Sequence, residues 1–401
     1  MSRLTKDEPI FLDYHSTTPV DKRVAQVSFH YMLNEFGNAS STQHIFGERA
    51  AAAVERAREQ LASLINAKKA KTVFTSGATE SINILLQSLS GKALSKNQRL
   101  KVALSPLEHP AVIQTVRKLQ EQEKLAPSFL EVDRLGRIDL AQVREMLSAG
   151  TDLLCIMAAN NEIGNIYPIE EIGRLCDEFD TPFFCDASQA AGKVPIDFDN
   201  WNISYLVVSA HKIYGPKGAG ALVCKRAMLP KSIVFGGEQE YGVRSGTLNV
   251  PAIAAFGEAC RLRQEEMSID EQETARKRDR LKEALLKNIE NVVLNGDERS
   301  KLSGNLHISI PGIPNDILVT RLRNKVAIST GAACYAGVET PSHVLQAMGL
   351  SETEIESAIR IGIGKFTTAE DIDKAASLIV EEIRSIEKIL IAPSTGQASA
   401  V

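Results

Sequence analysis

The stretch YLVVSAHKIYGPKGAGALVC, residues 205–224, holds two short apolar runs on either side of a loop rich in glycine and proline. Similar apolar runs occur upstream of it, at TVFTS (72–76), KVALS (101–105), LLCIM (153–157) and PFFCD (182–186). These runs are apolar on both faces and alternate with helical stretches, which is typical of strands buried between two layers of helices. The pattern predicts a doubly wound α/β domain, in which ligands bind at the carboxyl ends of the strands.

The rest of the chain predicts a second, smaller unit. A charged stretch, residues 261–290, indicates a long solvated helix, and it is followed by a strand at 305–312 and helices at 317–325 and 369–391. We therefore expect a large α/β domain at residues 16–260 and a small α+β domain formed by 1–15 and 261–391. The small polar residues 392–401 predict a flexible tail.

Composition excludes several classes of protein. The 401 residues include 46 Lys and Arg against 50 Asp and Glu, a formal charge of −4 that excludes a strongly basic nucleic-acid binder. We find no apolar run near the ~18 residues of a membrane span and no apolar signal region at the N-terminus. The six cysteines show no Cys-x-x-Cys or zinc spacing, so we expect no metal site and reduced thiols in the cytoplasm.

Two strand ends carry motifs that suit parts of one cofactor. After TVFT, Gly77 permits a tight turn, Ala78 keeps bulk away, and the amides of the helix start, with the Thr79 hydroxyl, could hold a phosphate. An ordinary capped turn explains the same residues. After PFFC, Asp186 could cap the next helix or pair with a protonated heterocycle nitrogen, as the acidic partner of a pyridoxal ring does.

Three further strand ends add a lysine, a histidine and an amide. Lys212 follows a buried strand, and in a desolvated site it could form a Schiff base, although lone lysines are usually solvated. Pro110 holds His109 extended, so that its ring could lie over an aromatic ring, relay protons or merely satisfy a turn. The amides of Asn160 and Asn161 could bond a cofactor hydroxyl or a substrate carboxylate. Together with the phosphate cradle and the acid, this lysine indicates pyridoxal 5′-phosphate (PLP).

An ordered set of motifs carries a family resemblance over nearly the whole chain. Between LDYHSTTPVD (12–21) and IRIGIGKFTT (359–368) lie FTSGATES, EHPAV, NNEIG, CDASQAAGK, SAHKIYGPKGAGAL and VRSGTLNV. In this order they resemble the group I cysteine desulfurases of the NifS/IscS-like type, which are PLP-dependent. The resemblance implies a class V aminotransferase fold, that of PLP-dependent transferases of type I. Its large domain would hold a mainly parallel seven-stranded sheet.

The resemblance implies a role at the cofactor for each matching residue. Lys212 would form the Schiff base, and Asp186 would pair with the pyridine nitrogen. Gln189 would bond the ring hydroxyl, while His109 would stack on the ring and shuttle protons. The phosphate would be held by Ala78, Thr79, Ser209 and His211.

The resemblance also implies substrate contacts and a partner subunit. Asn161 and Arg360 would bind the substrate carboxylate, for which the planar fork of arginine is well suited. Thr247 would reach the phosphate of the other subunit, so that the active site forms at a homodimer interface.

Cys334 differs from the other five cysteines because it follows the small residues STGAA (329–333) rather than lying in or near a packed element. The resemblance makes it the nucleophile that takes sulfur from the substrate as a persulfide. The chain departs from the usual family pattern at Ala39, at the residues before Cys334, at the bulky Tyr335 and at Lys365.

The sequence thus predicts a cysteine desulfurase that converts L-cysteine to L-alanine. Its persulfide would pass to a sulfur-acceptor protein, such as a scaffold or a thiolation enzyme, with no direct role for nucleic acid or membrane. The alternatives are a selenocysteine lyase, a plain PLP aminotransferase and a non-catalytic scaffold. The pathway, whether iron–sulfur assembly, tRNA thiolation or DNA sulfur modification, stays open at this point.

Overall fold

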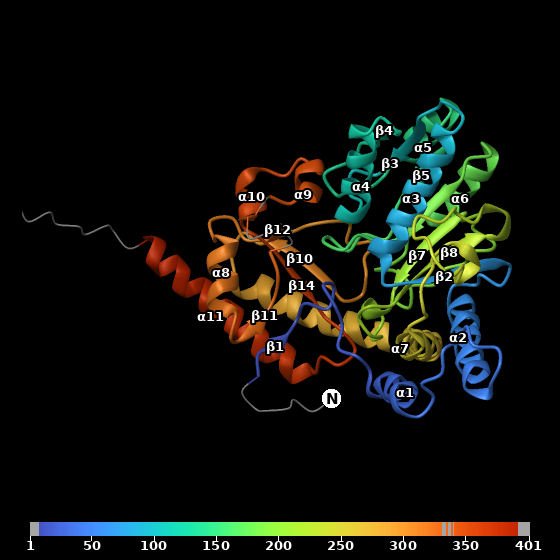
Figure 1. Ribbon diagram of the computed structural model, residues 1–401. Coiled ribbons are helices and arrows are strands. Elements are labelled where there is room, and N and C mark those ends of the chain that lie inside the picture. The colour runs from blue at the N-terminus through green and yellow to red at the C-terminus, as the bar shows by residue number, and fades with distance from the viewer. Residues whose placement is uncertain (1–7, 331–333, 336–337, 340, 392–401) are drawn as a thin grey trace, which may run out of the picture.

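The computed structural model describes residues 8–330, 334–335, 338–339 and 341–391. Within these residues the chain forms a larger α/β part and a smaller α+β part, which are joined by one long helix (Figure 1). The tail predicted at 392–401 lies outside the described residues, as does much of the segment around Cys334.

A seven-stranded sheet in the order β2-β8-β7-β6-β5-β3-β4 forms the centre of the larger part. Its strands are β2 (Ala70–Thr75), β3 (Leu100–Leu104), β4 (Leu125–Phe129), β5 (Leu153–Cys155), β6 (Phe183–Asp186), β7 (Tyr205–Ser209) and β8 (Gly220–Lys225). Strand β8 is antiparallel to both of its neighbours, and all other pairs are parallel. The mainly parallel seven-stranded sheet is therefore confirmed.

Strand β4 is the one member of this sheet for which we had no sequence signal. It contains Pro127, which has no N–H to donate, and three of its five residues are exposed. Proline is tolerated at a sheet edge, and β4 pairs only with β3.

Helices cover both faces of the sheet, which is why its strands are apolar throughout. Neighbouring strand residues enter opposite cores: Phe183 packs in the core formed with α2, α5 and α6, whereas Phe184 packs in the core formed with α3 and α4. The helices of the larger part up to this point are α1 (Lys22–Leu33), α2 (Ile45–Leu64), α3 (Ala78–Leu94), α4 (Pro110–Glu121), α5 (Leu140–Ser148) and α6 (Ile169–Glu178). Fully burying one such aromatic side chain is worth about 2–3 kcal/mol, so the two cores hold the strand ends firmly in place.

Five of the six cysteines belong to these packed regions. They are buried free thiols, and burial raises the pKa of each of them. The prediction that they are packing residues is confirmed for Cys155, Cys176, Cys185, Cys224 and Cys260, and a raised pKa disfavours the reactive thiolate.

The smaller part has its own hydrophobic core, packed between helices and a three-stranded antiparallel sheet, β14-β10-β9. Its helices are α8 (Asn315–Leu322), α9 (His343–Ala347), α10 (Glu352–Glu356) and α11 (Ala369–Ile391). Its strands are β1 (Ile10–Phe11), β9 (Val293–Leu294), β10 (Asn305–Ser309), β11 (Val326–Ala327), β12 (Cys334–Tyr335), β13 (Val338–Glu339) and β14 (Ala358–Gly362). In the larger part, the described residues also form the 3₁₀ turns η1 (Ala210–Lys212), η2 (Arg226–Met228) and η3 (Glu240–Gly242).

Helix α7 (Val250–Asn288) runs from one part to the other beneath the sheet (Figure 1). It begins eleven residues before the charged stretch that predicted it, because its first turns, from Val250 to Cys260, are apolar and buried in the core of the large sheet. The domain boundary predicted at 260/261 therefore falls inside a continuous helix.

The N-terminal segment also links the two parts. Strand β1 pairs in parallel with β11 in the smaller part, and the chain then passes from Leu12 to helix α1 in the larger part (Figure 1). On this path the backbone of Thr18 donates to the carbonyl of His211, 2.9 Å away, just beyond the end of β7. Residues 13–18 consequently lie beside the carboxyl ends of the central strands.

Candidate active site

The predicted strand-end residues line one cavity of about 220 Å³. Because β8 runs opposite to the other six strands, the carboxyl ends of β2, β5, β6 and β7 meet at the same edge. The lining residues are Ser16, Ala78, Thr79, His109, Met157, Ala159, Asn161, Asp186, Ser188, Gln189, Ser209, His211 and Lys212. Among the predicted site residues whose side chains are described, Asn160, Thr247 and Arg360 are not in this lining. The Asn160 amide is used within the loop instead, because its Nδ2 donates to the carbonyl of Leu107 at 3.0 Å and its Oδ1 accepts from the amide of Glu162 at 2.8 Å.

Helix α3 begins at this cavity without a side-chain cap. Its N-cap residue is Gly77, and the next amide, that of Ala78, donates to Ser209 Oγ at 2.9 Å. Strand β8 approaches so closely that a Cβ on Gly220 would lie 2.5 Å from the Cα of Gly77. Since a helix N-terminus attracts anions, this end of the cavity suits a phosphate.

His211 lies beside the same end of the cavity as an uncharged imidazole. Burial, together with the charges of Lys212 and Lys217, lowers the pKa of His211 to about 4. Its Nδ1 lies 3.1 Å from Thr17 Oγ1. A neutral imidazole and the Ser209 hydroxyl can both hydrogen-bond a phosphate oxygen.

Lys212 presents its amine to the cavity from turn η1. Its Nζ donates to the carbonyl oxygens of His15, at 2.5 Å, and Ser16, at 2.8 Å. Burial, followed by the charges of Lys193 and Arg360, lowers the pKa of Lys212 to about 7. A large share of this amine is therefore uncharged at neutral pH, as a nucleophile toward an aldehyde must be.

Asp186 and His109 both line the cavity, and each also makes the turn-forming hydrogen bond that was the simpler interpretation of its sequence. Asp186 Oδ1 accepts from the backbone of Ser188 at 2.9 Å. His109 is the N-cap of α4, and its Nδ1 accepts from the amide of Ala111 at 3.1 Å. Burial lowers the pKa of His109 and so favours the neutral ring. Because Nδ1 accepts from Ala111, the single proton of the neutral ring resides on Nε2.

Arg360 lies next to the cavity, on β14, and is only 7% exposed. Its guanidinium donates to the backbone carbonyl of Asn161 at 3.1 Å and to Asp13 Oδ1 at 2.9 Å. Its Nε is buried without a hydrogen-bond partner. Because an unpaired buried donor is costly, the arrangement favours binding of an acceptor such as a carboxylate.

Both flanks of the segment that carries Cys334 are tied to the edge of the cavity. On one side, Ser329 and Arg360 pair through their backbones, at 3.1 and 2.6 Å. On the other side, Ser342 Oγ donates to Glu162 Oε2 at 2.5 Å, and burial raises the pKa of this carboxyl to about 7. Between them, β12 pairs with β13, but the side chain of Cys334 lies outside the described part of the chain.

Sequence reasoning missed two groups that border the site. The N-terminal run LDYHSTT supplies Ser16 to the cavity and Asp13 to Arg360, although nothing in its pattern shows that it returns to strand ends far along the chain. Glu108, next to His109 in the sequence, is fully buried and accepts from the amide of Met157 at 2.7 Å. Burial raises the pKa of Glu108 to about 8, so this carboxyl is protonated at neutral pH. The signal in the sequence was a carboxylate three residues after the apolar run KVALS (101–105).

Thr247 is exposed and does not line the cavity of its own chain. The segment before it is anchored by Glu240, whose carboxylate accepts from Arg58 at 3.0 Å and from the amide of Phe74 at 2.6 Å. The structure therefore holds this segment in place without bringing Thr247 to the site.

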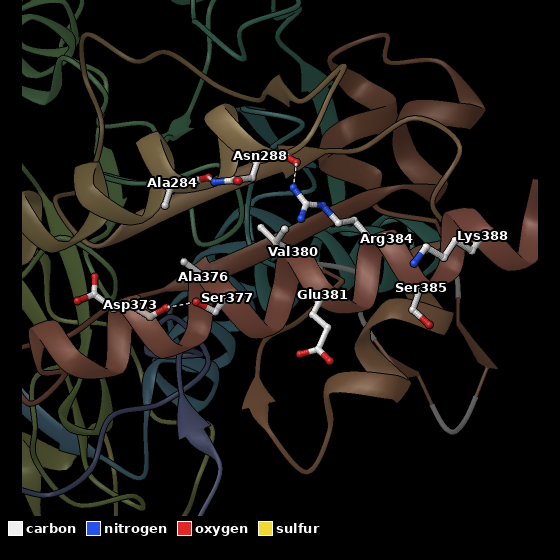
Figure 2. Close-up of a pocket in the computed structure, with 10 residues that line it drawn as sticks. All are labelled: Ala284, Asn288, Asp373, Ala376, Ser377, Val380, Glu381, Arg384, Ser385 and Lys388. Atoms are coloured by element: carbon white, nitrogen blue, oxygen red, sulfur yellow. Dashed lines mark hydrogen bonds between the residues drawn. The ribbon is translucent and has the colours of Figure 1, made fainter.

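A larger groove of about 730 Å³ lies between α7 and α11 in the smaller part. Figure 2 shows its lining, in which Ser377 donates to the backbone carbonyl of Asp373 and Arg384 to that of Asn288. Its lining contains no histidine or cysteine, and it lies along helices rather than at strand ends, so it lacks the combination of groups found in the strand-end cavity.

The residues of the strand-end cavity fit PLP. The uncapped start of α3 with Ser209 and His211 suits the phosphate, the carboxylate of Asp186 suits a protonated pyridine nitrogen, and the amine of Lys212 suits the aldehyde. Among the described residues, no three His, Cys, Asp or Glu side chains gather as a metal site would require, and no helix is long and apolar enough to cross a membrane.

Comparison with known proteins gives a consistent result. The family model for aminotransferase class V matches residues 10–375. The chain is 41% identical to the cysteine desulfurase IscS of Anaeromyxobacter sp. (strain Fw109-5), over 95% of this chain and 94% of that protein. It is 40% identical to the mitochondrial cysteine desulfurase of Arabidopsis thaliana, over 95% of this chain and 84% of that protein.

Solved structures are similar to it over the same extent. A NifS-like protein superposes with a TM-score of 0.87 at 30% identity, covering 94% of this chain and 100% of that one. SspA in complex with cysteine superposes with a TM-score of 0.78 at 32% identity, covering 90% of this chain and 100% of that one.

Proposed function

The chain belongs to the aminotransferase class V family, as its ordered motifs predicted, and we propose that it is a PLP-dependent cysteine desulfurase. The observation that carries the proposal is the meeting, in one cavity of about 220 Å³, of a lysine amine whose pKa is lowered to about 7, an anion-binding helix start and a carboxylate. Its substrate would be L-cysteine, and its products would be L-alanine and an enzyme persulfide.

The cofactor would be held by the residues that fit its parts. Lys212 would hold the aldehyde and Asp186 the ring nitrogen, and His109 would lie against the ring. The phosphate would be held by Ala78, Thr79, Ser209 and His211. When bound, PLP supplies an electron sink that weakens the bonds to the substrate α-carbon.

The remaining roles belong to the chain's own side chains. Arg360 and Asn161 would bind the substrate carboxylate, and Asp13 restrains the guanidinium so that little entropy is lost when it binds. Lys212, with a pKa near 7, can accept the proton of the α-carbon and return it. His109 can hold a proton on Nε2 beside it.

Cys334 would carry the sulfur. Its thiolate would attack the sulfur of the substrate, so that a sulfur–sulfur bond forms, the carbon–sulfur bond breaks, and the released carbon takes up a proton to give alanine. Support comes from the two anchored flanks, which start at Ser329 beside Arg360 and end at Ser342 beside Glu162.

The active unit would be a homodimer. An exposed apolar cluster at the end of α1 and the start of α2 supports this proposal, because patches of this kind usually mark interaction surfaces. The cluster contains Phe29, Met32, Leu33, Phe36 and Phe46, with the last two rings stacked at 5.7 Å. Thr247, outside its own cavity, would complete the phosphate site of the partner subunit.

The persulfide would pass to an acceptor protein in the cytoplasm. The described cysteines are free thiols, which suits a reducing compartment where a sulfur carrier stays unpaired. A scaffold protein or a thiolation enzyme could each accept the persulfide sulfur.

The proposal is tested by mixing the protein with L-cysteine, measuring alanine, and identifying the modified residue by mass spectrometry. Alanine and an added sulfur atom on Cys334 are expected. Cys334→Ser should retain the visible absorbance of bound PLP but form no persulfide, whereas Lys212→Ala should lose the covalently held chromophore.

Two controls separate the alternatives. L-selenocysteine in place of L-cysteine measures a preference for selenium, and a keto acid measures aminotransferase activity. Undiminished sulfide release by Cys334→Ser would overturn the role of this cysteine, and absence of PLP absorbance in the wild-type protein would overturn the cofactor.

A further inference from the structure

The side-chain amide of Gln189 is fixed by three contacts to two residues. Its Nε2 donates to the backbone carbonyl of His15 at 2.8 Å, and its Oε1 accepts from Lys193 Nζ at 2.9 Å. The Nδ1 of His15 lies 3.3 Å from the same Oε1. An ammonium group can only donate and a carbonyl can only accept, so these partners determine which end of the amide is oxygen.

The imidazole of His15 is uncharged and has one assignable tautomer. The residue is 3% exposed, and burial together with the charges of Lys193, Arg360 and Lys212 holds its pKa well below the ordinary value. Since Gln189 Oε1 only accepts, the single ring proton resides on Nδ1. The other ring nitrogen, Nε2, is buried with no partner among the described residues.

These contacts leave Gln189 with one function toward the cavity. Its oxygen already receives two donors, and one N–H of Nε2 is used by the carbonyl of His15. The second N–H remains available, and Gln189 lines the cavity together with Asp186 and Lys212. A ligand atom that meets Gln189 must therefore be a hydrogen-bond acceptor.

We propose that His15 and Lys193 are positioning residues, which hold Gln189 as a permanent donor to the ring oxygen of the bound cofactor. The proposal rests on the proposed PLP function, and it concerns two side chains that do not themselves line the cavity. A donor fixed in this orientation stabilises the ionised form of the ring hydroxyl over the protonated form.

A packing role alone does not account for the arrangement. Burial lowers the pKa of Lys193 to about 8, so its ammonium form is held at a cost beside the second amine of Lys212. An apolar side chain would fill the same space without that cost. The ammonium group of Lys193 can only donate, so it can bond the oxygen of the Gln189 amide but not its NH₂ group. The Gln189 amide therefore cannot flip without losing this hydrogen bond.

Equilibrium titration of the full-length apoprotein tests the proposal with two ligands, PLP and its 3-deoxy analogue, which lacks the ring hydroxyl. His15→Leu removes the Nδ1 donor and should weaken PLP binding about fivefold, the typical value of one hydrogen bond, while leaving binding of the analogue unchanged. His15→Asn has a branched side chain like that of leucine but restores an N–H near the position of Nδ1, so it should bind PLP as the wild type does. Lys193→Met should show the same split between the two ligands.

The outcomes separate the positioning role from a structural one. The proposal would be overturned if the variants bound PLP and the analogue with equally reduced affinity. It would also be overturned if His15→Leu or Lys193→Met bound PLP as tightly as the wild type does. If His15→Leu does not fold, Lys193→Met decides, with thermal denaturation as the check on each variant. Failure of the wild-type protein to bind PLP would instead overturn the proposed function.

Discussion

At the scale of single residues, the chemistry of the site depends on how side chains are surrounded. Lys212 has the same side chain as the exposed lysines of this protein, but it lies beside Lys193 and Arg360 and away from bulk water. Desolvation and nearby cations both disfavour the ammonium form, and together they lower its pKa to about 7. Above that pH the amine is uncharged and reactive.

The expected consequence is a pH profile of the apoprotein. The rate of reductive methylation of Lys212 by formaldehyde should rise with pH and level off above about pH 7, as followed by mass spectrometry of the digest. A short peptide with the sequence of residues 209–218 is the control, because its lysines are solvated and should titrate near the ordinary value of about 10.4. A profile for Lys212 that matches the peptide would contradict the assigned environment.

The sequence identified the residues at the strand ends but not those that support them. Asp186 ends a buried strand, and Lys212 and His109 lie within a few residues after one, so a pattern of apolar runs is enough to find such positions. His15 and Asp13 reach the site only because β1 pairs with β11 and the chain then returns past the cavity. Contacts between residues so distant in sequence depend on the tertiary fold, which local patterns do not contain.

At the scale of elements, the start of helix α3 depends on its close approach to strand β8. The Cα of Gly77 would lie 2.5 Å from a Cβ at position 220, and backbone atoms cannot move aside as a flexible side chain can. The anion-binding end of the cavity therefore requires glycine at position 220.

Gly220→Ala should displace the start of α3, lower the melting temperature and weaken PLP binding by about tenfold, because overpacking of this kind costs about 1–3 kcal/mol. Gly91→Ala is the matched control, since it lies in the same helix with open space around it and should, if anything, stabilise the helix. Melting curves and PLP titrations of both variants measure the effect. Equal PLP affinity in the two variants would show that β8 does not set the position of this helix start.

The elements that sequence patterns misjudged have physical explanations. Strand β4 was missed because Pro127 and Ser128 interrupt its apolar residues, and a proline is tolerated there because the strand lies at the edge of the sheet. Helix α7 was predicted from its charged half, residues 261–290, but its first turns are apolar and continue into the large core. Neither the edge position nor the continuity can be read from a window of local sequence.

At the scale of the whole molecule, Thr247 does not line the cavity of its own chain, and the chain exposes an apolar cluster at Phe29, Phe36 and Phe46. If the proposed homodimer shares its sites, each site takes Lys212 from one subunit and Thr247 from the other. This arrangement can be tested by mixing two impaired variants, because only a shared site can be restored by exchange of subunits.

We expect Lys212→Ala and Thr247→Ala to be impaired alone, and a 1:1 mixture, after dissociation and reassociation, to recover about a quarter of wild-type activity. Half of the dimers would then be mixed, and each mixed dimer would hold one site with both residues intact. Alanine formation from L-cysteine measures the recovery, and sedimentation velocity measures the dimer. Phe36→Asp in both proteins places a charge in the apolar cluster and should abolish the recovery together with the dimer. If Thr247 acted within its own chain, every mixed dimer would hold two damaged sites, and reassociation would restore nothing.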